Sequence, residues 1–279
     1  MDIELGKFNR LKIVKEVDFG LYLDGGEEGE ILLPARYVPY NYEIGQSIDV
    51  FVYLDNEERL IATTLKPYVQ VGEFAYLQVS WVNQYGAFLD WGLMKDLFCP
   101  FREQKRKMEV GRSYIIHTHV DEESFRIMAS AKVEHYLSTE RPPYTPEEEV
   151  NLLVWQHTNM GYKVIIDNKY QGLVFDNQVF RELEVGDSLK GYIIQVRDDG
   201  KVDVALQKKG RQQTLDFADT LFNYMENNGG RCYLHDKSPA EEIYQRFKVS
   251  KKVFKKAVGD LYKRRLIEIT DHGLFLIEN

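Results

Sequence analysis

The segment Val82–Trp91, VNQYGAFLDW, carries the pattern that decides the fold, because two other parts of the chain repeat it. In every copy a bulky residue precedes a glycine, a proline or phenylalanine closes a short apolar strand 14 residues later, and a second glycine follows after 11 more. The three sets are Gly20, Pro34 and Gly45; Gly86, Pro100 and Gly111; and Gly161, Phe175 and Gly186. Two spacings that hold in three copies indicate an internal repeat, which determines how the rest of the chain is interpreted.

Each copy predicts five short strands. In the second copy Tyr76–Val82 and Tyr85–Trp91 are rich in residues that favour strands, and alternation places Phe88 and Leu89 on opposite faces. The other expected strands of this copy are 97–100, 113–120 and 125–130. Five strands of this kind favour a partly open Greek-key barrel, the OB fold.

The glycines of the repeat are expected to have structural roles. Gly86 fits a strand position where a side chain would obstruct a bend or a close backbone, and Gly111 fits a tight entry into the fourth strand. In the third copy Asp199-Gly200 separates two apolar runs and predicts a hairpin turn, since glycine tolerates positive φ. The turn sequence DNKYQG, residues 167–172, leaves the third strand of that copy open to a shift of two residues.

The second copy resembles the RNA-binding domain named after ribosomal small-subunit protein S1, here called the S1 domain. The resemblance rests on VNQYGAFLDW and VGRSYIIHTHVDEESFRIMASAK, with EVDFGLYLD as a first-copy version. In that family the aromatic residue before the glycine and the one two positions after it lie on the exposed barrel face and stack on bases. The resemblance therefore implies RNA contacts from Tyr85 and Phe88, and from Phe19 and Tyr22, where the second aromatic is shifted by one position.

The copies depart from the S1 pattern in different ways. The family commonly has a histidine in the third strand, where this chain has Leu32 and Phe98. The third copy has Met160 and Lys163 at the aromatic positions, so Lys163 is its candidate RNA contact. The second copy is therefore expected to have the best RNA-binding face. Packing is the alternative role for an aromatic residue beside a glycine in a barrel.

The last seventy residues change to a helical pattern at Lys208–Gln212. A first helix is expected to stop at Asn227–Gly230, and Ser238–Glu241 has the residues of a capping box that begins a second. Ser250 is expected to cap a third helix, whose buried stripe is Val253, Phe254, Ala257, Val258, Leu261 and Tyr262. Two strands, 266–269 and 274–277, complete a winged helix.

The third helix is the expected recognition helix. Residues 249–265 contain seven basic residues and one acidic residue, although the whole chain has a net charge of −8. The candidate phosphate contacts are Lys251, Lys252, Lys255, Lys256, Lys263 and Arg264. Solvation of an exposed helix face and docking of a protein partner are the alternatives for these cations.

The order of the parts resembles the conserved virulence factor B family of bacterial proteins, also called the YitL family. The most specific stretches are GYIIQVRDDGKVDVALQ and SPAEEIYQRFKVSKKVFKKAVGDLYKRRLI. The expected fold is multidomain and mainly β, with three tandem OB-fold barrels at 1–66, 69–134 and 147–209 and an α+β winged helix at 212–279. The resemblance implies RNA binding and a role in regulating gene expression.

Other classes of protein are disfavoured. The chain has no apolar run long enough for a membrane span and no apolar stretch after its first residues, and Cys99 and Cys232 are too few for a disulfide framework, so a cytoplasmic location is expected. No phosphate-binding glycine loop occurs, and His117 and His119 have no third metal ligand nearby in the sequence. We therefore expect no enzyme activity, no cofactor, no metal and no membrane partner.

Three functions remain open at this stage. The first is a regulator that contacts single-stranded RNA through the aromatic barrel faces and the basic helix. The second is a protein-interaction scaffold whose barrels are structural and whose winged helix docks a partner. The third is a transcription regulator that binds duplex DNA through the winged helix.

Overall fold

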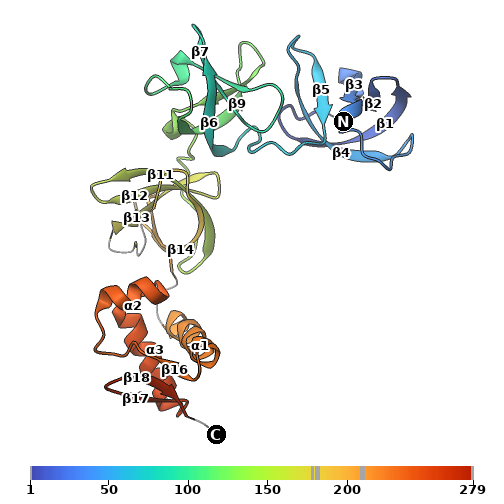
Figure 1. Cartoon of the computed structure of the whole chain (residues 1–279). Coiled ribbons are helices and arrows are strands. Elements are labelled where there is room, and N and C mark those ends of the chain that lie inside the picture. Colours follow the sequence, from blue (N-terminus) through green and yellow to red (C-terminus); the bar gives the residue numbers. More distant parts are fainter. Residues whose placement is uncertain (1, 177–178, 180–182, 208–210, 278–279) are drawn as a thin grey trace. The chain divides into compact units, whose positions relative to one another are not determined.

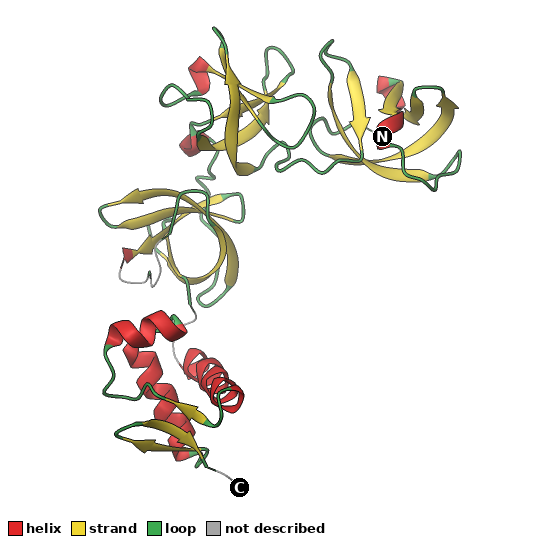
Figure 2. Ribbon diagram, viewed as in Figure 1, coloured by secondary structure: helices red, strands yellow, loops and turns green. Residues whose placement is uncertain are grey.

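The computed structural model describes residues 2–176, 179, 183–207 and 211–277, with the backbone alone for 211–216. The chain divides into two compact units, Met1–Ser138 and Thr139–Asn279. Two barrels make up the first unit, and a third barrel and a helical domain make up the second (Figures 1 and 2). The change of pattern was predicted at Lys208–Gln212, and residues 208–210 of that stretch lie outside the described residues. Among the helices of the described ranges, none is both long and apolar enough to cross a membrane.

Each copy of the repeat forms one five-stranded barrel with the same strand order. The first is built from β1 (Phe8–Val17), β2 (Gly20–Asp24), β3 (Glu30–Pro34), β4 (Ser47–Leu54) and β5 (Leu60–Thr63). The second is built from β6 (Phe74–Val82), β7 (Gly86–Leu89), β8 (Leu97–Pro100), β9 (Ser113–Val120) and β10 (Ile127–Ser130). The third is built from β11 (Glu149–Thr158), β12 (Gly161–Ile166), β13 (Tyr170–Phe175), β14 (Ser188–Val196) and β15 (Val202–Ala205). The predicted mainly β architecture of three tandem barrels is confirmed.

The barrels are closed, so the prediction that they are partly open is wrong. Closure depends on the long first strand, which pairs with the second strand through one half and with the fourth through the other. The strand register shifts between the two halves, after Ile13, Val79 and Val154. The second glycine of each copy has positive φ. Its N–H donates to the carbonyl oxygen of the residue after which the register shifts (Ile13, Val79 or Val154), at 2.8–2.9 Å. The repeated glycine therefore stabilises the bulge that lets one strand bend around the barrel.

The first glycine of each copy has a steric role. The second strand of each barrel begins at this glycine and pairs with the third strand in the same register in all three barrels. Gly20 is opposite Pro34, Gly86 is opposite Pro100 and Gly161 is opposite Phe175. A Cβ atom at these glycines would lie 2.1–2.3 Å from a backbone carbonyl oxygen of the facing strand. The equal registers also show that the third strand of the third barrel has no two-residue shift.

The first two barrels share a core. The Phe51 and Tyr53 rings of β4 pack edge-on against Trp91, with centroids 5.7 and 6.5 Å away, and all three side chains are buried. Across the same junction the Lys95 ammonium donates a hydrogen bond to the Asp55 carbonyl oxygen at 2.7 Å. Residues 1–138 therefore form one packed body in which the barrels support each other.

The helical domain consists of three helices and a small sheet with strand order β16-β18-β17. Its elements are α1 (Arg211–Asn227), β16 (Arg231–Cys232), α2 (Ala240–Phe247), α3 (Lys251–Lys263), β17 (Ile267–Thr270) and β18 (Gly273–Leu276). The predicted winged helix is confirmed, and the short strand β16 is an addition to the predicted two-stranded wing. The core lies between the helices and the sheet and includes Leu221, Ile243, Phe254 and Leu261.

Two local predictions in this domain are wrong. The predicted capping box is absent, because the Ser238 hydroxyl accepts the His235 N–H at 3.0 Å and so closes the preceding turn. Tyr262 is 56% exposed rather than buried, because Leu261 holds the core position in that turn of α3. The cap on α3 is confirmed, since the Ser250 hydroxyl accepts the Val253 N–H at 3.4 Å.

Candidate nucleic-acid interface

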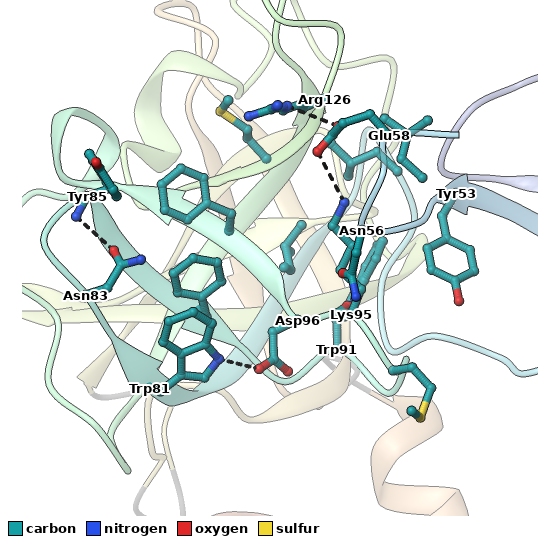
Figure 3. A pocket seen from close by; sticks show the side chains of 17 residues that line it. Tyr53, Asn56, Glu58, Trp81, Asn83, Tyr85, Trp91, Lys95, Asp96 and Arg126 are labelled. Atoms are coloured by element: carbon teal, nitrogen blue, oxygen red, sulfur yellow. Dashed lines mark hydrogen bonds and ion pairs between the residues drawn. The ribbon is translucent and has the colours of Figure 1, made fainter. Parts of the chain in front are cut away.

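Three aromatic side chains of the second barrel form one surface, here called the aromatic platform: Trp81, Phe88 and Phe98. The Trp81 and Phe88 rings are stacked, with centroids 3.7 Å apart and planes 3° from parallel, and Phe98 lies 4.9 Å beyond Phe88. They come from adjacent strands, because Trp81 is opposite Phe88 and Phe88 is opposite Phe98. All three residues line one pocket, and Figure 3 shows Trp81 at its side. Trp81 remains 46% exposed, so its ring is available to a flat ligand.

Sequence reasoning identified Phe88 but missed Trp81. Simple alternation places Trp81 on the same side as the buried Val79, whereas the bulge between these residues turns both Ser80 and Trp81 outward. The matching positions are Lys15 and Tyr22 in the first barrel and Gln156 and Lys163 in the third. The second barrel is therefore the one in which these two positions hold stacked rings.

Tyr85 lies before the platform, in the turn that enters β7. Its side chain is 65% exposed, and its backbone N–H donates to the Asn83 Oδ1 atom at 2.8 Å, which fixes the turn. The ring packed face to face on Phe88 belongs to Trp81 rather than to Tyr85. Phe88 and Tyr85, which Figure 3 labels, nevertheless line the same pocket.

That pocket has a volume of about 710 Å³ and lies within the first unit. The second barrel contributes the platform, Tyr85, Met94 and Asp96, and the first contributes residues from the end of β4 and the turn after it, including Asn56 and Glu58. Two cations at its edge are already paired, because Glu58 lies 3.6 Å from Lys95 and 3.0 Å from Arg126. The Trp81 indole N–H donates to Asp96 Oδ2 at 2.9 Å. The pocket thus combines an aromatic wall with two carboxylates, those of Asp96 and the ion-paired Glu58, and little unpaired positive charge.

A basic segment follows β8. The Phe101 N–H donates to the Tyr85 carbonyl oxygen at 3.1 Å, which attaches the start of this segment to the turn beside the pocket. Lys107 and Arg106 are exposed and lie 5.8 and 5.9 Å from the ring centroids of Phe101 and Tyr114. These cations can contact phosphates beside bases on the platform. The run Lys105-Arg106-Lys107 was the sequence signal for them, and the sequence reasoning overlooked it.

The predicted residues of the first and third barrels have different surroundings. Phe19 is 56% exposed and forms a T-shaped pair with the half-buried Tyr22, with ring centroids 6.2 Å apart. The Lys15 ammonium lies 4.8 Å from the Tyr22 ring centroid, so a cation covers the place that Trp81 takes in the second barrel. In the third barrel the Lys163 ammonium lies 5.2 Å from the ring of the buried Trp155. Lys163 can contact a phosphate but provides no stacking surface.

Two histidines of β9 pack in the second barrel, where His117 is buried and His119 is half-buried. His117 packs on the Tyr136 ring, with centroids 4.0 Å apart, and His119 lies 5.1 Å from the same ring. Burial, together with the neighbouring His119, lowers the pKa of His117 from 6.5 to about 4, and burial also lowers the pKa of His119. Over the part of the chain that the structure describes, no three His, Cys, Asp or Glu side chains are grouped closely enough to hold a metal ion. Both rings are neutral near pH 7 and belong to the packing of the barrel.

The basic side chains of α3 divide into two groups. Lys252, Lys255, Lys256 and Lys263 are exposed, and their spacing of three, four and eleven residues places them along one side of the helix. Lys251 is half-buried and donates to the Lys237 carbonyl oxygen at 3.4 Å. Arg264 lies 3.4 Å from Asp260 and 3.6 Å from Asp219, so two carboxylates partly neutralise it.

Two regions of the chain match models of known protein families. Residues 5–65 match the model of the S1 domain, and residues 219–276 match that of the CvfB-like winged helix domain. The chain is 28% identical to the uncharacterized protein YitL of Bacillus subtilis, over 91% of this chain and 87% of that protein. It is 22% identical to conserved virulence factor B of Staphylococcus aureus, over 81% of this chain and 78% of that protein. The predicted resemblance to the conserved virulence factor B family is confirmed. The S1 match falls on the first barrel, whereas the aromatic platform lies on the second.

One solved structure covers nearly the same length. It is a multidomain protein with nucleic acid binding domains from Streptococcus pneumoniae, and the match covers 98% of both chains with 24% identity and a TM-score of 0.42. The S1 match supports nucleic-acid binding as the general property of this chain.

Proposed function

We propose that this chain is an RNA-binding regulatory protein whose second barrel stacks bases of single-stranded RNA on the aromatic platform. The observation that carries the proposal is the stacked Trp81–Phe88 pair, which presents a half-exposed indole beside a pocket. A face that is flat and apolar suits an unpaired base better than a duplex, whose bases are already stacked on each other. The regulatory part of the proposal rests on the resemblance to the conserved virulence factor B family.

Two sets of cations can extend the contact along the RNA backbone. Arg106 and Lys107 lie on the segment that is hydrogen-bonded to the Tyr85 turn, next to the platform. The four exposed lysines of α3 form a second basic surface in the other unit. Each phosphate that they neutralise releases counterions, so binding should weaken steeply as salt increases.

The direct test is fluorescence anisotropy of the full-length chain with single-stranded RNA, matched single-stranded DNA and duplex DNA, at two salt concentrations. We expect salt-sensitive binding with a preference for single-stranded RNA. The double variant Tyr85→Ala, Phe88→Ala and the single variant Trp81→Ala should each weaken RNA binding about tenfold or more, because a stacked base contributes roughly 1–3 kcal/mol. Met160→Ala is the matched control, since Met160 is an exposed residue before the corresponding glycine of the third barrel.

Circular dichroism should show that the variants remain folded before their affinities are compared. Unchanged RNA affinity in a folded Trp81→Ala variant and in the double variant would exclude stacking on the platform. Absence of binding to every nucleic acid at low salt would favour the protein-interaction scaffold, which the non-aromatic Gln156 and Lys163 of the third barrel support. A preference for duplex DNA that depends on the α3 lysines would favour the transcription regulator instead.

A further inference from the structure

One carboxylate of the pocket is hydrogen-bonded to the aromatic platform, and it belongs to Asp96. Asp96 lies in the turn between β7 and β8 and lines the pocket beside the platform (Figure 3). Its Oδ2 atom accepts the Trp81 indole N–H at 2.9 Å, and its Oδ1 atom receives a long hydrogen bond of 3.4 Å from the Ser80 hydroxyl. A carboxylate has about four acceptor positions. Asp96 therefore retains capacity to accept further hydrogen bonds from a ligand that stacks on the neighbouring rings.

The position of Asp96 is fixed on both sides. The preceding residue, Lys95, is held at two atoms. Its carbonyl oxygen accepts the Trp91 indole N–H at 2.6 Å, and its ammonium donates to the Asp55 carbonyl oxygen at 2.7 Å. The residue after it begins β8. An acceptor held in this way does not have to be ordered when a ligand binds, which favours selective recognition.

We propose that the pocket binds a guanine base of single-stranded RNA, with its Watson–Crick edge read by Asp96. This inference rests on the proposed function and adds the identity of the base. Guanine has two adjacent donors on that edge, the N1–H and the exocyclic amino group, and they match the two oxygens of one carboxylate. Trp81 would hold the base by stacking on its open face, with Phe88 packed behind the indole, while Asp96 accepts the two hydrogen bonds of the base.

The other bases match this carboxylate less well. Adenine and cytosine each place their amino group beside a ring nitrogen that is an acceptor, and that nitrogen would face the second carboxylate oxygen. Uracil has one N–H between two carbonyl oxygens, which the carboxylate repels on both sides. A site with a buried or half-buried acceptor pair discriminates against ligands that leave it unpaired. The order of affinity expected at this position is therefore guanine first and uracil last.

The pocket suits a base within a chain better than a free guanine nucleotide. The cations at its edge, Lys95 and Arg126, are both paired with Glu58, so a compact di- or triphosphate finds little unpaired positive charge there. The exposed Arg106 and Lys107 lie instead on the basic segment beside the Tyr85 turn. That arrangement fits a strand whose backbone continues out of the pocket and along the barrel.

The test uses the full-length protein and oligouridines of about eight nucleotides, a length within the range of one OB-fold site. One central position carries guanine, adenine, cytosine, uracil or hypoxanthine, which lacks the exocyclic amino group of guanine. We expect the guanine oligonucleotide to bind about tenfold more tightly than the adenine and hypoxanthine oligonucleotides. Free guanosine monophosphate, added as a competitor, should displace the oligonucleotide only weakly.

The variant Asp96→Asn should remove the guanine preference, because an amide offers one acceptor where the carboxylate offers two. Glu122→Gln is the control, since it removes the same charge from an exposed residue outside the pocket and should preserve the ratio of affinities. Equal binding of all the oligonucleotides by the unmodified protein would overturn the guanine assignment while RNA binding itself stands. Absence of binding to all of them would instead overturn the proposed function, and efficient competition by guanosine monophosphate would identify a free-nucleotide site.

Discussion

At the scale of single residues, the surface of each barrel is set by the two positions that follow the bulge and face each other across the first hairpin. These positions hold Trp81 and Phe88 in the second barrel and Lys15 and Tyr22 in the first. The same backbone therefore presents a ring on a ring in one barrel and a cation on a ring in the other. Both arrangements are individually stabilising, but the first leaves an aromatic face open to a ligand.

Buried His117 makes the stability of the second barrel depend on pH. Because its pKa is about 4 in the folded chain and near 6.5 when unfolded, the unfolded chain binds more protons between these values. The free energy of unfolding should therefore fall as the pH decreases from about 6.5 to 4, by an amount on the order of 2 kcal/mol. Urea denaturation at several pH values should show this decrease, and His117→Phe should reduce it.

The neighbouring rings make His117→Phe a suitable variant. Phe74 and Tyr136 lie 4.7 and 4.0 Å from the His117 ring centroid, so an uncharged ring can pack against the same neighbours. His119 should preserve a smaller part of the pH dependence, because its pKa is also lowered by burial. An identical pH dependence in the variant and the unmodified chain would show that His117 is not the group responsible.

Sequence alone could predict part of the site at this scale. The outward direction of the half-buried Phe88 follows from alternation along β7, and the exposure of Tyr85 follows from its place in a turn. The outward direction of Trp81 does not follow, because it depends on a bulge that involves a hydrogen bond from Gly111, 32 residues away from Val79. The Asp96–Trp81 contact joins residues 15 positions apart and could be seen only once the strands were paired.

At the scale of strands and turns, the two glycines of each copy should respond differently to substitution. In Gly86→Ala the added carbon would lie 2.3 Å from the Cys99 carbonyl oxygen, so β7 and β8 must move apart. Gly111→Ala has open space but a φ of +80°, which costs only the strain of a left-handed conformation. We expect losses of stability of about 3 kcal/mol for Gly86→Ala and about 1 kcal/mol for Gly111→Ala, measured by thermal or urea unfolding. Equal losses would contradict the steric role of Gly86.

The exposed side of α3 should contribute to the salt dependence of RNA binding. In Lys255→Ala, Lys256→Ala the slope of log affinity against log salt should fall in magnitude by roughly 0.7 for each RNA phosphate that the variant no longer neutralises. The control is Lys190→Ala, Lys201→Ala, which removes two cations that lie 3.5 Å from Glu149 and 2.8 Å from Asp199. An unchanged slope in the α3 variant would mean that this helix face does not bind the RNA backbone.

At the scale of the whole molecule, the shared core should make the first two barrels lose stability together. Trp91→Ala removes a buried indole that packs on Phe51 and Tyr53, and we expect a cost of about 3–5 kcal/mol. Hydrogen exchange should then increase in peptides of both barrels, including β4. Val164→Ala is the comparison, because that residue is buried within the third barrel and should leave residues 1–138 unaffected. Faster exchange confined to the second barrel would show that the two cores are independent.

The number of barrels and their strand order could be predicted from the sequence, because each copy contains its own spacing of glycines and apolar strands. The packing of the first two barrels against each other could not be predicted from the sequence. Nothing in the sequence of one copy distinguishes an aromatic side chain that fills its own barrel from one that packs on the neighbouring barrel. Trp91 belongs to the second copy in sequence yet packs on β4 of the first. The pocket depends on that packing, because both barrels line it.

The constant register of the hairpin also has an evolutionary consequence. Gly20 and Pro34, Gly86 and Pro100, and Gly161 and Phe175 are each 14 residues apart, but the strands between them stop pairing at different points. In the third barrel the ladder continues to Ile166 and Tyr170, while in the second it ends at Leu89 and Leu97. Compared with the third ladder, the residues released from the second ladder are Asp90, Trp91, Lys95 and Asp96. A chain built in this way can acquire a new ligand by converting ladder into loop, without inserting a residue or disturbing the barrel.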